Sequence, residues 1–228
     1  RGLVVGGSVG RDEPWPLSDI DILPIFTGGS DTEAEINRCR SFLVDWWVAS
    51  GRAQYLDVGW LRFTDQEAEE TITSGAADAA AKMSDHRWLH GLDKSYGGYG
   101  AADPDGLAQA FATWVTKTRF NPVVVSARLE QWWAQVDDGR DRALNAMTAD
   151  DRVGATLALR EAAGALRLVL IEGWGERLSS LNREWTLFER MAKAHNADAL
   201  ATRIAVLADA QREDALERAK KAPLWLQE

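Results

Sequence analysis

Two aspartates near the start of the chain, Asp19 and Asp21, flank one isoleucine at the head of the apolar run Ile20–Phe26. Because alternate residues of an extended strand point to the same side, we expect the two carboxylates to project together, with Ile20 and Ile22 turned toward the core. Two carboxylates this close repel each other, and burying them unpaired is costly. Mg²⁺ removes that cost and is commonly held by one or two carboxylates plus substrate phosphates. The pair therefore predicts a magnesium site, although a lone Asp-x-Asp more often marks a solvated strand edge.

A glycine turn precedes the acid pair along the chain. Gly6, Gly7 and Ser8 follow the apolar run Leu3–Val5, and glycine leaves backbone N–H groups uncovered, which suits phosphate oxygens. Such a turn by itself is more often a plain tight loop. Beside two carboxylates it predicts a phosphate cradle next to a metal site, the combination that phosphoryl or nucleotidyl transfer requires.

Together these motifs resemble the signature of the DNA polymerase β-type nucleotidyltransferase superfamily. The Gly7-Ser8 dipeptide, a spacer of ten residues and the acid pair are similar to its Gly-Ser, spacer and Asp-x-Asp. The superfamily includes aminoglycoside and lincosamide nucleotidyltransferases, the minimal nucleotidyltransferases of toxin–antitoxin pairs, and tRNA-tailing enzymes. The specific resemblance covers residues 3–63.

The same resemblance implies a third acid on a later strand. The strand-like segment 54–63 offers Asp57, which would share a strand face with Tyr55 and Gly59, and Gly59 would leave room beside it. By resemblance, Asp57 is either a shared metal ligand or the general base for the acceptor hydroxyl, rather than a surface acid.

The resemblance also implies an activity. An acceptor hydroxyl would attack the α-phosphorus of ATP or another NTP in line, with Mg²⁺ as cofactor, and pyrophosphate would leave. The residues implied as catalytic and as metal ligands are Asp19, Asp21 and Asp57. Gly7 and Ser8 are implied to hold the β- and γ-phosphates.

Two cations are further candidates for the triphosphate. Arg11 lies in the spacer, where it could touch phosphates or remain a solvated loop charge. Lys193 is expected to contact the triphosphate because related enzymes place a lysine on a helix in the C-terminal half of the chain.

The polar segment 84–94 is a second place where chemistry is conceivable. His86 and His90 would share one face of a helix and could bind a metal. No carboxylate motif of the zinc-protease type accompanies them, so we expect a polar loop at the rim of a cleft instead.

The elements that must position these residues follow a strand, helix, strand order. Leu3–Val5, Ile20–Phe26 and 54–63 have the pattern of strands. Between the last two, a helix is expected to begin near Ser30 and to stop at Gly51. This order predicts a sheet with helices packed on it.

The glycine-rich segment 95–106 is expected to be a linker. The predicted fold is therefore α+β, with a mixed-sheet nucleotidyltransferase domain over residues 1–100 and an α-helical bundle domain over residues 101–228. By resemblance, the helical domain closes the active-site cleft and contacts the substrate. Its helices are predicted at Leu107–Thr118, Val123–Val136, Asp150–Ile171, Glu184–Ala194 and Ala197–Lys220, with a break at 137–139.

The composition limits the partners. The 228 residues carry a net charge of −9, which argues against a general nucleic-acid or membrane-surface binder and would attract a polycationic acceptor. Cys39 is the only cysteine, so no internal disulfide is expected, as in a reducing cytoplasm. No apolar run approaches the ~18–20 residues of a membrane span. Since adjacent tryptophans cannot both face one core, Trp132 or Trp133 is expected to line a cleft or a homodimer contact.

Three functions remain open. The leading one is a nucleotidyltransferase that modifies a small-molecule hydroxyl, such as that of an aminoglycoside-like antibiotic, using ATP or another NTP. The second is a toxin-type nucleotidyltransferase acting on tRNA or protein, against which the acidic composition weighs mildly where tRNA is concerned. The third is a silent nucleotide-binding regulator or antitoxin, although a binder has no use for a third carboxylate.

Overall fold

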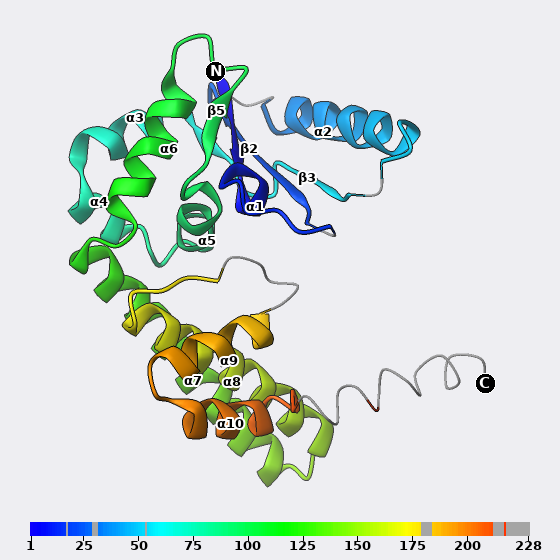
Figure 1. Ribbon diagram of the computed structural model, residues 1–228, viewed down its shortest axis with the longest axis vertical. Coiled ribbons are helices and arrows are strands. Elements are labelled where there is room, and N and C mark those ends of the chain that lie inside the picture. The colour runs from blue at the N-terminus through cyan, green and yellow to red at the C-terminus, as the bar shows by residue number, and fades with distance from the viewer. Residues whose placement is uncertain (17, 29–31, 53, 179–183, 212–216, 218–228) are drawn as a thin grey trace. The chain divides into compact units, whose positions relative to one another are not determined.

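A computed structural model describes the chain except for residues 17, 29–31, 53, 179–183, 212–216 and 218–228. The chain divides into two compact units, Arg1–Arg128 and Leu129–Glu228. The first unit is α+β with a small mixed sheet, and the described part of the second is helical (Figure 1). Within the described residues, no helix is long and apolar enough to cross a membrane.

The sheet of the first unit has five strands and mixed directions. Its strands are β1 (Gly2–Gly6), β2 (Ile20–Phe26), β3 (Leu56–Val58), β4 (Phe63–Thr64) and β5 (Tyr99–Ala101). Their order is β3-β2-β1-β5, with β4 also pairing with β2. β1 runs antiparallel to β2 and β5, whereas β3 and β4 run parallel to β2. The single strand predicted over 54–63 is thus two short strands, divided by a turn at Gly59 with φ of 74°.

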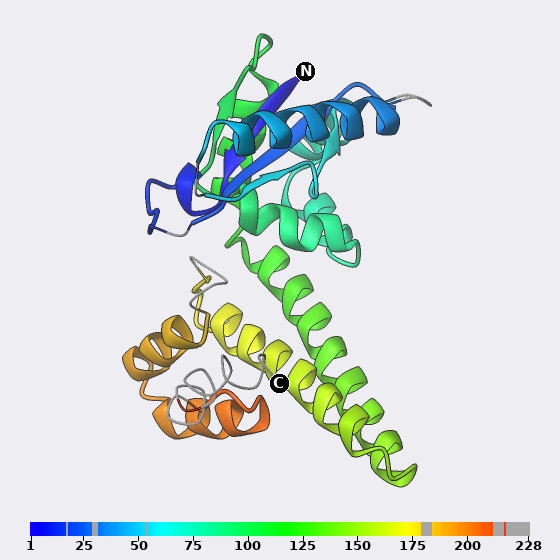
Figure 2. The same ribbon diagram turned by 90° about the vertical axis from the view of Figure 1, so that its right-hand side faces the viewer.

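Helices cover both faces of this sheet. The helices that precede α7 (Pro122–Thr148) are α1 (Gly7–Gly10), α2 (Thr32–Ala49), α3 (Asp65–Ser74), α4 (Ala76–Ala81), α5 (His86–Ser95) and α6 (Leu107–Thr118). Figure 2 shows α2 lying across one face, and α5 and α6 contact β1 from the other. The predicted stop of α2 is confirmed, because Gly51 has φ of 67° and donates to the carbonyl of Val48. The predicted start at Ser30 lies outside the described residues.

Burial along β2 differs between its two faces. Along β2, Asp21, Leu23 and Ile25 are buried, whereas Ile20 and Ile22 are only half-buried. The prediction that Ile20 and Ile22 turn to the core is therefore wrong, because the deeper burial is on the face of Asp21. Asp21 therefore lies on the more deeply buried face of β2, which it shares with two large apolar side chains.

The glycine-rich segment 95–106 is not a linker. It contains β5, whose residues pair with Leu3–Val5 of β1. A Cβ on Gly100 would lie 2.6 Å from the backbone nitrogen of Gln109 on α6. The glycines therefore permit close packing of an edge strand against a helix, and the first unit continues through α6 to Arg128 rather than to residue 100.

An aromatic cluster forms the centre of the first unit. Phe63 packs against Trp88 of α5 and Phe111 of α6, with ring centroids 4.7 and 5.1 Å apart, and all three are buried. A Cβ on Gly91 would lie 2.5 Å from the Phe63 ring. Gly91 thus lets α5 approach the sheet closely, which places the C-terminal turn of α5, with Lys94, against β2.

The second unit contains most of α7 (Pro122–Thr148) together with α8 (Arg152–Gly173), α9 (Glu184–Ala194) and α10 (Asp198–Leu207). The predicted break at 137–139 is wrong, because α7 runs through it without interruption. A Cβ on Gly139 would lie 2.9 Å from that of Ala162, so this glycine serves the close approach of α7 and α8. The predicted helix Glu184–Ala194 is confirmed.

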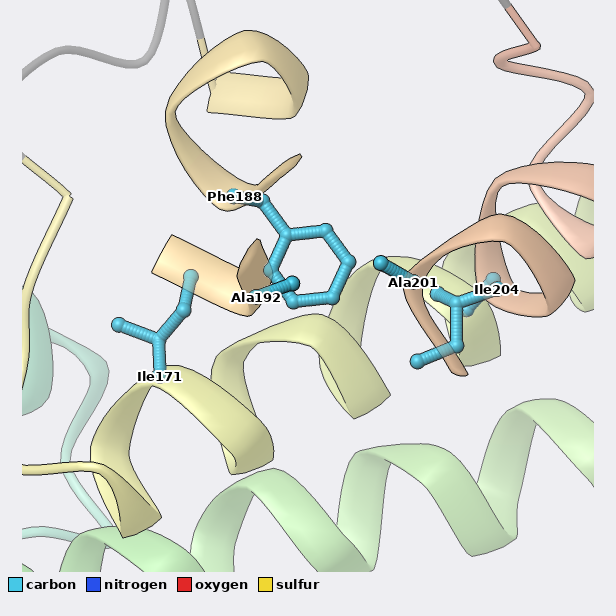
Figure 3. Close-up of a cluster of buried hydrophobic side chains, with 6 residues drawn as sticks. Ile171, Phe188, Ala192, Ala201 and Ile204 are labelled. Carbon is cyan, nitrogen blue, oxygen red and sulfur yellow. The ribbon is translucent and has the colours of Figure 1, made fainter. Parts of the chain in front are cut away.

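The three later helices meet in a small apolar core. Figure 3 shows Ile171 of α8, Phe188 and Ala192 of α9, and Ala201 and Ile204 of α10 converging there. The described helix α10 ends at Leu207, and much of the rest of the predicted helix lies outside the described residues.

The tryptophan pair on α7 divides as expected. Trp132 is 3% exposed and Trp133 is 48% exposed. Trp133 is therefore the member of the pair that solvent can reach.

Candidate functional site

The two acidic strands are held in register at the candidate site. Asp21 of β2 and Asp57 of β3 are Cα partners in the parallel pairing, so their side chains leave the sheet on the same face. Asp19, just before β2, is close enough that its charge raises the pKa of both carboxyls. The structure thus brings together the three acids that the sequence singled out.

Asp21 is the most constrained of the three. Its side chain is 5% exposed, and burial is the largest cause that raises its pKa. Lys94 opposes this rise, whereas Asp19 and Asp57 add to it. For Asp57, burial again raises the pKa most, and Lys94 again lowers it. Negative charge is therefore held here in a partly dry environment that favours a cation.

The glycine turn touches the acid pair directly. Gly7 begins α1 with φ of 60°, and a Cβ on it would lie 1.8 Å from Oδ2 of Asp21. Since Gly6 and Asp21 are Cα partners between β1 and β2, the antiparallel pairing sets this contact. The carboxylate fits against the turn only because residue 7 has no side chain.

Ser8, the predicted phosphate contact, is engaged within the protein. Its Oγ donates to Oγ of Ser18 over 2.9 Å, and both residues are buried. Ser18 Oγ also accepts the backbone N–H of Trp15. In this structure the Ser8 hydroxyl therefore closes the spacer loop on itself.

Lys94 is a site residue that the sequence argument missed. Its Nζ lies 2.5 Å from Oδ1 of Asp21. The prediction of a polar loop over 84–94 is wrong, because α5 occupies it, capped by the Asp85 carboxylate, which accepts the backbone N–H of Arg87. The apolar spacing of the buried Trp88, Leu89 and Leu92 was the signal that could have shown the helix.

The two histidines of α5 do share a face, as their spacing predicts. Their ring centroids are 4.1 Å apart, and both rings contact Trp60. Burial and the neighbouring His86 lower the pKa of His90 from 6.5 to about 4. His90 is therefore uncharged at neutral pH.

Asp21, Asp57 and Lys94 meet at one small pocket. It is lined by Asp21, Ile22, Leu23, Asp57, Trp60, Leu61 and Lys94. The acids and the lysine supply its polar wall, and Trp60 is its exposed aromatic wall, with 53% of the residue accessible.

The acids of the pocket meet part of what Mg²⁺ requires of its ligands. Among the described residues, no group of three His, Cys, Asp or Glu side chains is arranged to hold an ion by itself. Asp21 and Asp57 nevertheless supply the one or two carboxylates that Mg²⁺ commonly takes from protein, the remaining ligands being water and phosphate oxygens. The Gly7 turn leaves backbone, and no side chain, beside Oδ2 of Asp21. The two neighbouring carboxylates thus match what Mg²⁺ commonly takes from protein.

The two predicted phosphate cations lie in different units of the chain. Arg11 is neither a solvated loop charge nor a pocket-lining residue, because its side chain is 6% exposed and its Nε lies 3.2 Å from Oε2 of Glu13. Its stem lies against Gly97, where a Cβ would come within 2.7 Å of Arg11 Cγ. Lys193 is exposed at the last turn of α9, in the second unit.

Comparison with protein-family models, with curated proteins and with solved structures found no match for this chain.

Proposed function

We propose that this protein is a Mg²⁺-dependent nucleotidyltransferase that moves an NMP, with ATP as the first NTP to be tried, onto a hydroxyl of a small molecule. The observation that carries the proposal is the pairing of Asp21 with Asp57 in register, with the Asp21 carboxylate packed on the Gly7 turn. Three nearby acids and a glycine turn serve one purpose well, which is to hold a cation and phosphates side by side.

The residues divide the work as follows. Asp21 and Asp57, with Asp19 adding negative charge, would hold the ion, which when bound supplies charge neutralisation to the phosphates. Gly7, which is buried against the Asp21 carboxylate, would fix the position of that metal ligand. Lys94, whose ammonium now pairs with Asp21, would be released toward the phosphates as the charge of the site changes.

In the chemical step, the acceptor oxygen forms a bond to the α-phosphorus while the bond from that phosphorus to the bridging oxygen breaks. Pyrophosphate leaves with the bonding electrons. The proton of the hydroxyl would pass to Asp57 if that carboxylate is not a metal ligand, and otherwise to water. The net charge of −9 favours a polycationic acceptor such as an aminoglycoside, and modification of such an antibiotic would confer resistance.

One observation favours a second candidate, a nucleotide-binding protein with a silent site. The Lys94 ammonium already neutralises Asp21 in part, so a nucleotide could bind without a metal and without turnover. Measurement of Mg²⁺-dependent pyrophosphate release separates the two candidates.

The experiment follows pyrophosphate from each of the four NTPs, alone, with an aminoglycoside panel, and with tRNA. We expect Asp21→Asn to lower the rate by at least ~100-fold while the far-UV circular dichroism stays unchanged. Asp45→Asn, which makes the same charge change at an exposed position of α2, is the matched control. Near-normal turnover in Asp21→Asn would refute the proposal, release only with tRNA would indicate a toxin-type enzyme, and no release with Mg²⁺-independent nucleotide binding would support the silent site.

A further inference from the structure

The chain leaves β3 in a way that keeps a large aromatic side chain at the pocket. Gly59 has φ of 74° and donates its N–H to the carbonyl of Ile22 over 3.0 Å. This left-handed turn is open to glycine at little cost. The next residue, Trp60, remains 53% exposed, whereas Leu61 and Phe63 beyond it are buried.

Trp60 is supported by two rings from α5. His86 meets it edge-on, with centroids 5.7 Å apart and an interplanar angle of 78°, and His90 is tilted against it at 6.2 Å. These contacts hold the indole in place while leaving more than half of the residue accessible. His90, with its pKa lowered to about 4, adds no positive charge to the support at neutral pH.

An exposed tryptophan alone needs no explanation, and Trp133 on α7 is exposed to a similar extent, 48%. What distinguishes Trp60 is its position in the wall of the pocket that also contains Asp21, Asp57 and Lys94. One wall of the pocket is therefore suited to phosphates and a cation, and the other to a flat ring. A nucleoside triphosphate joins those two groups in one molecule.

We propose that Trp60, supported by His86 and His90, is the platform on which the nucleobase of the NTP stacks. This inference depends on the proposed function, because it takes the phosphates of the same nucleotide to lie near Asp21.

The remaining pocket wall indicates how selective such a platform would be. Apart from Asp21, Asp57 and Lys94, the lining residues are largely apolar, and among them only the indole N–H of Trp60 could donate a hydrogen bond to the edge of a base. Stacking responds to the area of the ring and tolerates any base. The site should therefore rank nucleotides by ring size, purines above pyrimidines, and separate ATP poorly from GTP.

Isothermal titration calorimetry on the full chain with Mg²⁺ tests this inference. The probes are α,β-methylene analogues of ATP and CTP, which cannot release pyrophosphate, and inorganic tripolyphosphate, which has no base. We expect Trp60→Ala to raise the Kd of the ATP analogue ~10-fold, to raise that of the CTP analogue less, and to leave tripolyphosphate binding unchanged. Trp60→Phe should recover most of the loss, and Trp133→Ala, the control of matched exposure, should change nothing.

Each result has a definite reading. Unchanged binding of the ATP analogue by Trp60→Ala would overturn the platform, and so would an equal loss of tripolyphosphate binding, which would mean that the residue supports the pocket as a whole. In either case, the proposed function stands if the Asp21→Asn variant binds tripolyphosphate more weakly than the unaltered protein does. If the unaltered protein binds neither the analogues nor tripolyphosphate with Mg²⁺, the proposed function itself fails, and the platform with it.

Discussion

Lys94 and Asp21 form the pivotal contact at the scale of single residues. The ammonium lies 2.5 Å from the carboxylate, and the two side chains are only 21% and 5% exposed. A buried charge is tolerable when it is paired and expensive when its partner is removed. The pair therefore keeps three neighbouring acids compatible with a folded protein, and a cation that reaches the site must compete with the ammonium for Asp21.

We expect Lys94→Met to lower the free energy of unfolding by about 3 kcal/mol, since Asp21 then lacks its counter-charge. Excess Mg²⁺ should restore part of this loss in the variant and stabilise the unaltered protein less. Urea unfolding in EDTA and in Mg²⁺ measures both quantities. Lys117→Met, at an exposed lysine of α6, makes the same charge change and should behave like the unaltered protein. A Lys94→Met protein with full stability, or one indifferent to Mg²⁺, would contradict the expectation.

At the scale of elements, the junction of β1 and α1 shapes the site. The left-handed conformation of Gly7 turns the chain directly beside the Asp21 carboxylate, with room for no Cβ. Gly51, at the end of α2, has a nearly identical φ of 67°, but a Cβ there would meet no atom within 4 Å. A side chain at Gly51 would therefore meet backbone strain alone, whereas one at Gly7 would meet the same strain and a steric contact as well.

Substitution of each glycine by alanine tests this distinction. Gly51→Ala should cost ~1–2 kcal/mol, the strain of a left-handed backbone alone. Gly7→Ala carries the same strain plus a contact of 1.8 Å with Asp21 Oδ2, so we expect a clearly larger loss of stability together with loss of pyrophosphate release. Equal losses in urea unfolding for the two variants would show that Asp21 moves aside freely and that the turn does not position it.

At the scale of the whole molecule, one helix belongs to both compact units. The first turns of α7 lie in the first unit and the rest lies in the second. Arg128, 1% exposed, explains this, because it donates to the carbonyl of Leu89 and pairs with Asp93, both on α5. Asp93 also pairs with Arg119 at 2.5 Å, so two buried guanidinium groups meet at one carboxylate.

We expect Arg128→Met to destabilise the first unit by about 3 kcal/mol, because it breaks a buried ion pair and removes the donor to the Leu89 carbonyl. Hydrogen exchange should accelerate in the amides of α5 and stay unchanged in those of α9. Arg140→Met is the control, since Arg140 lies on the same helix but is exposed with its partners Asp137 and Asp141. Faster exchange in α9 but not in α5 would place this arginine's role in the second unit instead.

Local patterns in the sequence were sufficient to predict several features of the structure. The strand at Ile20–Phe26, the stop at Gly51, the helix Glu184–Ala194 and the split of the tryptophan pair all follow from short-range geometry. Two features were misread for the same reason. Gly100 and Gly139 look like breakers, yet each allows its element to approach closely the helix that follows it: Gly100 approaches Gln109 of α6, and Gly139 approaches Ala162 of α8.

The candidate site shows the same division. Spacing along the chain predicted that Asp19 and Asp21 project to one side, because alternation is a property of the extended backbone itself. Only the tertiary structure decided that Asp21 is buried, that Asp57 lies beside it in register, and that Lys94 and Trp60 complete the pocket. Burial, register and contact between distant segments depend on how the helices cover both faces of the sheet, and no short stretch of sequence contains that information.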